Sequence, residues 1–104
     1  MDLDYGLEKL NMSVYYLSGS ESKSERLFNA VTYSLMSIKP EFELPELLRE
    51  DFATLMAELT AVKTADDDER VLATINSFGE VELSKAIEKI INFYDSACCH
   101  CKPN

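Results

Sequence analysis

The stretch LDYGLEKLNMSVYYL, residues 3–17, decides the fold. An apolar residue recurs in it at every third or fourth position, which is the spacing of one face of an α-helix. This face consists of Leu3, Leu7, Leu10, Val14 and Leu17. Three other large side chains, those of Tyr5, Met12 and Tyr16, fall on the opposite side of the same helix. A surface helix of a small domain needs only one apolar face. We therefore expect this helix either to be central in a bundle or to contact something outside it.

Similar spacing along the rest of the chain predicts further helices. Ser22 followed by Glu25 is a helix-capping pattern, and Pro40 and Pro45 separate a second helix from a third. No stretch alternates apolar and polar residues for long, as a strand would. The chain has 104 residues, enough for one domain. We expect an all-α, single-domain, up-and-down bundle of four to five helices, at about 2–17, 23–38, 45–62, 67–77 and 80–97. The bundle domain would cover residues 1–97, and residues 98–104 would form a flexible C-terminal tail.

The inward faces of these helices predict the hydrophobic core. The third helix has one clean apolar face, as an ordinary surface helix does. The last helix has a broader one, which suits the most buried helix of a bundle. The expected core consists of Leu7, Leu10, Val14, Val31, Leu35, Phe52, Leu55, Leu59, Ile75, Leu83, Ile87 and Ile90.

The second helix repeats the two-sided pattern of the first, because Tyr33 and Met36 lie opposite its own apolar face. If the two helices are antiparallel neighbours, their outward residues form one patch. Tyrosine and methionine are enriched where proteins meet. We therefore expect a homodimer interface made of Tyr5, Met12, Tyr16, Tyr33 and Met36. Two simpler interpretations stay open: a later helix of the same chain covers some of these residues, or they are exposed side chains without a partner.

The net charge of −9 is large for a chain of this size. Such a charge disfavours direct binding to nucleic acid or to anionic membranes, and it favours a basic protein partner. The acids concentrate in segments 41–51 and 66–69, where predicted helices begin. They either complement the positive ends of helix dipoles or form an acidic surface, for which the candidates are Glu41, Glu43, Glu46, Glu50, Asp66, Asp67 and Asp68. An acidic surface could also imitate nucleic acid and inhibit a DNA-binding protein.

The sequence contains no recognisable catalytic constellation. Three isolated glycines cannot make a phosphate-binding loop, and there is no His-Glu-x-x-His motif. A catalytic triad or a di-iron bundle would have to use His100, the single histidine, which lies near the end of the chain. We therefore expect a protein that is not an enzyme, with no catalytic residues and no cofactor.

The C-terminal run of Cys98, Cys99, His100 and Cys101 is the densest group of metal-binding side chain types. Cys98 and Cys101 have Cys-x-x-Cys spacing, so Cys98, His100 and Cys101 are candidate ligands for a soft metal ion. A zinc site normally draws on a second, separate pair of ligands, which a second copy of the chain could supply. A cysteine at a helix C-terminus also lacks the dipole that lowers the pKa of a redox-active thiol. A metal or redox sensor is therefore an alternative function, and a tail without such a role is the simpler interpretation.

The first residues, Met1 to Asp4, are acidic and are not followed by a long apolar run. This pattern predicts neither a signal peptide nor a membrane span, so we expect a cytoplasmic protein. Taken with the two-sided helices, these features favour a small acidic protein that acts by protein–protein binding, as an adaptor, regulator or inhibitor. Its partners would be a second copy of itself and a basic protein.

Overall fold

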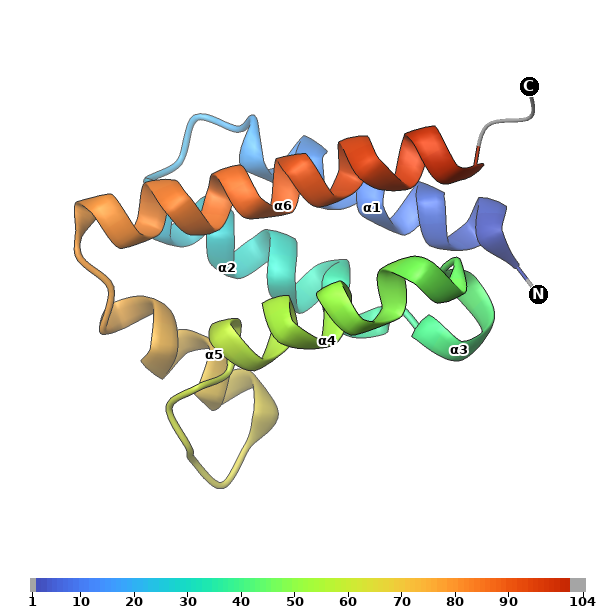
Figure 1. Ribbon diagram of the computed structural model, residues 1–104. Coiled ribbons are helices and arrows are strands. Elements are labelled where there is room, and N and C mark those ends of the chain that lie inside the picture. Colours follow the sequence, from blue (N-terminus) through green and yellow to red (C-terminus); the bar gives the residue numbers. More distant parts are fainter. Residues whose placement is uncertain (1, 102–104) are drawn as a thin grey trace.

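The computed structural model describes residues 2–101, except for the side chains of residues 67, 68 and 101 (Figure 1). This part of the chain is helical and contains no strand, which confirms the all-α class. It has six α-helices and one short 3-10 helix where four to five helices were expected, because an additional short helix forms between the second and third predicted ones. The elements are α1 (Leu3–Leu17), α2 (Lys23–Tyr33), the short 3-10 helix η1 (Leu35–Ser37), α3 (Pro40–Glu43), α4 (Glu46–Leu59), α5 (Asp67–Asn76) and α6 (Glu80–Cys101). None of them is long and apolar enough to cross a membrane.

The helices form one compact bundle in which α1 contacts both α2 and α6 (Figure 1). α2 also packs against α5, and α4 runs alongside α6 in the opposite direction. The N-terminus, α3 and the end of α6 lie at the same end of the molecule. As a result, the outer side of α1 and its neighbour η1 form one surface of the bundle, and α4 with α6 form another.

The core consists of the inward faces of these helices, and most of the predicted core residues are buried. Leu7, Val14 and Ile87 are the exceptions: they are half-buried, because they lie at the edges of their helical faces. The largest side chains with almost no exposure are Leu10, Leu27, Leu35, Leu44, Leu59, Ile75 and Ile90. Leu44 was not expected there, because it lies between the second and third predicted helices.

The second helix ends earlier than its apolar pattern predicted. α2 stops at Tyr33, and Ser34 has φ −130° and ψ −64°, which is not a helical conformation. The chain then tightens into η1, in which the backbone N–H of Ser37 donates to the carbonyl of Ser34 at 3.1 Å. A helix cannot easily continue into a proline, so the break before Pro40 was foreseen, but its place and the tighter turn were not.

The segment between the second and third predicted helices, where no helix was expected, contains the short helix α3, with Pro40 in its first turn. Proline suits that position because its missing N–H would have no helical partner there. The side chain of Arg49 holds this segment against α4. Its Nε donates to the carbonyls of Pro40 at 2.9 Å and Leu44 at 3.2 Å, and its Nη2 donates to Glu41 O at 3.1 Å.

Two other helix ends differ from the prediction. α4 ends at Leu59 rather than near Val62, and Thr60 Oγ1 then donates to the carbonyl of Met56 at 2.7 Å. α6 continues past Ala97 to Cys101, so the predicted tail begins as helix. Residues 102–104 of that tail lie outside the described residues.

Candidate functional site

One face of the bundle carries several large, exposed apolar side chains, and we call it the tyrosine face. It consists of Tyr5, Met12, Tyr15 and Tyr16 from α1 and Tyr33 from the end of α2. All of these except Tyr16 are between 44% and 70% exposed. The rings of Tyr15 and Tyr16 lie edge to face with centroids 6.3 Å apart, and those of Tyr16 and Tyr33 are 6.0 Å apart. The three rings therefore pack against one another along this surface.

The structure places four of the five predicted interface residues on this face, to different depths, and the fifth, Met36, turns inward. Tyr5, Met12 and Tyr33 are exposed, whereas Tyr16 and Met36 are half-buried and pack against the core. Met36 turns inward because α2 ends before it, which changes the direction in which its side chain points. Tyr15 was missed by the sequence analysis, although it is the most exposed residue of the face. Tyr15 lies three residues after Met12, a spacing that places both side chains on the same side of a helix.

A buried ion pair lies beneath the tyrosine face. Lys9 Nζ is 3.0 Å from Glu43 Oε1 and 3.1 Å from Oε2, and it also donates to the carbonyl of Ser37 at 2.6 Å. The same ammonium lies 4.3 Å from the centroid of the Tyr5 ring, a cation–π contact. Lys9 therefore ties α1 to both α3 and η1, and it helps to hold the ring of Tyr5 in place.

Glu43 is buried, although the sequence placed it on an acidic surface. Burial by itself raises the pKa of this carboxyl group, but the backbone N–H of Lys39, which donates to Oε1 at 2.6 Å, lowers it. Lys9 lowers the pKa of Glu43 further through its hydrogen bond and its positive charge, and the charge of Lys39 adds to this effect. The net effect is a pKa below the ordinary value, so Glu43 is ionised and neutralises Lys9 near pH 7.

Gly6 allows α3 to lie directly on α1. A Cβ atom at this position would lie 2.0 Å from the backbone oxygen of Glu43. A residue other than glycine would not fit there, because its Cβ atom would collide with the backbone of Glu43, which cannot rotate away as a side chain could. The close approach of the two helices is what brings Glu43 within reach of Lys9, one turn further along α1.

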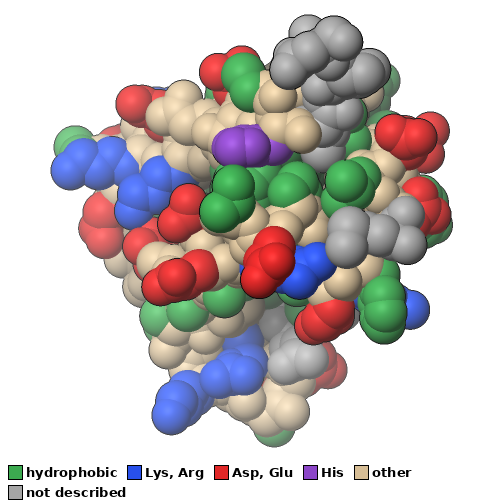
Figure 2. Space-filling model, turned by 45° about the vertical axis from the view of Figure 1, so that its right-hand side comes forward, with side chains coloured by type: hydrophobic (Ala, Val, Ile, Leu, Met, Phe, Trp, Pro, Cys, Tyr) green, Lys and Arg blue, Asp and Glu red, His purple; other side chains and the backbone are tan. Residues whose placement is uncertain are grey.

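The other predicted acidic residues do not form a single charged patch. Glu41, Glu46, Glu50 and Asp66 are exposed, while the side chains of Asp67 and Asp68 lie outside the described residues. Figure 2 shows acidic side chains interspersed with hydrophobic and basic ones at the end of the molecule that carries the N-terminus and α3. The guanidinium of Arg49 donates to backbone carbonyls, that of Glu41 among them, and keeps its positive charge beside these acids.

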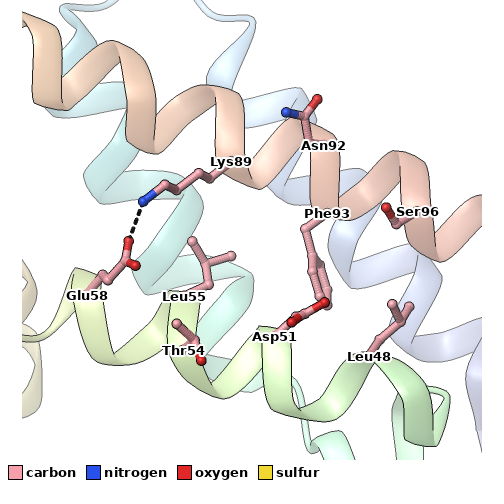
Figure 3. Close-up of a pocket in the computed structure, with 9 residues that line it drawn as sticks. All are labelled: Leu48, Asp51, Thr54, Leu55, Glu58, Lys89, Asn92, Phe93 and Ser96. Atoms are coloured by element: carbon pink, nitrogen blue, oxygen red, sulfur yellow. Dashed lines mark hydrogen bonds and ion pairs between the residues drawn. The ribbon is translucent and has the colours of Figure 1, made fainter.

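A hollow of about 340 Å³ lies between α4 and α6, and Figure 3 shows the residues that line it. The side chains of Leu48, Leu55 and Phe93 form its apolar part, and each is at most 8% exposed. Lys89 Nζ reaches across to Glu58 Oε2 at 2.7 Å (Figure 3). Because the apolar atoms are already shielded from water, a ligand would gain little by covering them. We therefore regard this α4–α6 hollow as a packing interface and not as a binding site.

The predicted metal ligands lie in the last turns of α6. Cys98 is half-buried, His100 is exposed, and the side chain of Cys101 lies outside the described residues. Cys98 acts instead on Tyr94: its hydrogen bond raises the pKa of the phenol, and burial raises it further. The hydroxyl of Tyr94 donates to Asn11 Oδ1 at 3.2 Å, which links α6 to α1. Among the described side chains, no three from His, Cys, Asp and Glu are grouped so as to hold a metal ion.

No known protein family matches this chain, and no curated protein or solved structure matches it either. A function has to be inferred from the chemistry of the described surface. On that surface the tyrosine face is the strongest candidate, because it combines exposed apolar area with supported side chains.

Proposed function

We propose that this chain is a small protein without enzymatic activity that acts by protein–protein binding, and that it works as a homodimer. The tyrosine face is the contact surface between the two copies. The observation that carries this proposal is the grouping of Tyr5, Met12, Tyr15 and Tyr33 on one face of α1 and α2, all of them exposed. Single exposed apolar residues are common on any protein, but a contiguous group of large ones marks an interaction site.

The size of the face sets the expected strength of the dimer. An aromatic side chain can bury about 200 Å², so these four partly exposed residues offer roughly 400 Å² per copy. This area is about half of what each partner buries in an interface of standard size, which is ~800 Å². The polar residues around the face have to supply the rest. We therefore expect a weak dimer that exchanges with the monomer.

Charge also favours this face as the contact surface. Two copies with a net charge of −9 each repel one another unless they meet where the acid density is low. The hollow beside Tyr5 and Met12 is lined by two charged residues, Glu8 and Lys9, and Lys9 is neutralised by Glu43. The exposed acids Glu41, Glu46 and Glu50 then remain available for a basic partner protein.

Light scattering over a dilution series tests the proposal. The parent should show a mass that rises from monomer to dimer with concentration, and Tyr15→Ala with Tyr33→Ala should stay a monomer while it melts like the parent. The matched control is Leu72→Ala with Val81→Ala, which also removes two exposed apolar side chains but from α5 and α6. A parent that stays monomeric at high micromolar concentration contradicts the proposal, and so does a control that dissociates as readily as the tyrosine variant.

A further inference from the structure

We infer that the two copies pair through antiparallel α1 helices, with Tyr5 of each copy opposite Tyr15 of the other and Glu8 opposite Met12. This inference rests on the proposed homodimer and adds its geometry. It is carried by an exposed line of side chains along α1, by the charge that this line contains, and by a hollow beside it.

The line consists of Tyr5, Glu8, Met12 and Tyr15. Their spacing of three, four and three residues is the one with which helices pair in a coiled coil. All four side chains are exposed, although the opposite face of α1 is buried against α2 and α6. α1 therefore presents to solvent a second, straight contact line that no element of the described chain covers.

The order of the residues along this line selects the antiparallel arrangement. Read in either direction, the line begins and ends with tyrosine and has one glutamate and one methionine between. Two antiparallel copies place each Glu8 beside a Met12, whereas two parallel copies place Glu8 against Glu8. Like charges that meet at an interface are costly, and the loss is greatest where water is excluded. In an acidic protein, the antiparallel register keeps the two glutamates apart.

A hollow next to this line of exposed side chains is the place where the tyrosine of the second copy binds. Its volume is about 450 Å³, and its lining includes Tyr5, Met12 and Ser37. In the antiparallel register Tyr15 of the second copy faces this hollow. Tyr15 is 70% exposed and its ring already rests against Tyr16, while the ring of Tyr5 is held by Lys9. Both rings already contact side chains of their own chain before the copies meet, which lowers the entropy cost of binding.

Two substitutions of the same residue, Met12→Lys and Met12→Glu, test the register. In the antiparallel dimer residue 12 faces Glu8 of the other copy, so the lysine finds an opposite charge and the glutamate a like one. We expect Met12→Glu to weaken dimerisation about tenfold or more at low ionic strength, and Met12→Lys to leave it close to the parent. Both variants should melt like the parent, because Met12 is exposed in the monomer.

The double variant Met12→Glu with Glu8→Lys decides the question independently. The antiparallel dimer then has two facing pairs of opposite charge and should recover the affinity of the parent. A parallel dimer would face lysine with lysine and glutamate with glutamate, and would dissociate. Sedimentation equilibrium at low and high salt measures each constant, and the differences should shrink as salt screens them.

The outcomes separate the inference from the proposal on which it rests. The antiparallel register is wrong, and the homodimer stands, if the parent dimerises but Met12→Lys and Met12→Glu weaken dimerisation equally. The same holds if the parent dimerises but the double variant does not recover its affinity. A parent that remains a monomer overturns the homodimer, and the register falls with it.

Discussion

The tyrosine face and the α4–α6 hollow differ in where their apolar atoms lie. The hollow is concave, but Leu55 and Phe93 below it are already buried. The tyrosine face also has a hollow, beside Tyr5 and Met12, but here Tyr15 and Tyr33 project into water. Binding is driven by the apolar area that a partner newly removes from water, and of these two regions the tyrosine face offers more of that area. In this small bundle a cavity without exposed apolar side chains is therefore a poor guide to a binding site.

The largest expected effect separates the two regions by stability. Leu55→Ala should lower the free energy of unfolding by about 4 kcal/mol, because it removes buried methyl groups and enlarges the α4–α6 hollow. Tyr15→Ala, on the tyrosine face, should change it by less than about 0.5 kcal/mol under conditions where the chain is monomeric. Urea denaturation at low protein concentration measures both. Equal losses would show that Tyr15 belongs to the core or that Leu55 does not.

A smaller effect concerns the ion pair that supports the tyrosine face from below. Glu43→Gln should lower the free energy of unfolding by about 2 kcal/mol near pH 7. This loss is smaller than for a fully buried pair, because the Lys9 side chain keeps 15% exposure. The conservative control Glu41→Gln changes an exposed acid of the same helix and should cost almost nothing. A cost at Glu43 no greater than that at Glu41 would contradict the role of the pair.

The stabilisation that Glu43 contributes should change with pH in one direction only. The pKa of Glu43 is lowered in the folded protein from its ordinary value of 4.5, so its ionised form stabilises the fold. The stabilisation is fully present above 4.5 and is lost as the pH falls through the lowered pKa. The difference in unfolding free energy between the parent and Glu43→Gln should therefore be constant near neutral pH and shrink in acid. A difference that grows in acid would mean that the protonated form of Glu43, and not the ionised form, stabilises the fold.

Much of the fold could be predicted from the sequence, because periodicity reports which side of a helix is buried. The apolar spacing identified the long helices and most of the core, and Ser22 caps α2 as its pattern indicated, with its Oγ accepting from the N–H of Glu25 at 3.2 Å. α3 could not be predicted, because four residues do not form a stable helix alone. It depends on Arg49 and on the space at Gly6, which are tertiary contacts.

The tyrosine face could be predicted only in part, for a related reason. Helical geometry placed Tyr5, Met12 and Tyr33 away from the core, and each is exposed in the structure. It could not show that the chain leaves the helical path at Ser34, so Met36 was placed on the outside. It also could not show that Tyr16 packs against the core and the ring of Tyr33, while its neighbour Tyr15 is more exposed.

The smallest expected effect tests whether the α4–α6 hollow is only a packing interface. Glu58 and Lys89 bridge it with a short ion pair, but their side chains are 47% and 54% exposed. Water and salt screen such a pair, and holding two long side chains in place costs entropy, so Glu58→Gln should change the unfolding free energy by less than about 0.5 kcal/mol. The dimerisation constant should not change either, because the pair lies on a different face from Tyr5 and Met12. Urea denaturation and light scattering measure the two quantities. A loss above about 1 kcal/mol, or a change in the mass of the particle, would mean that the bridge organises a functional surface.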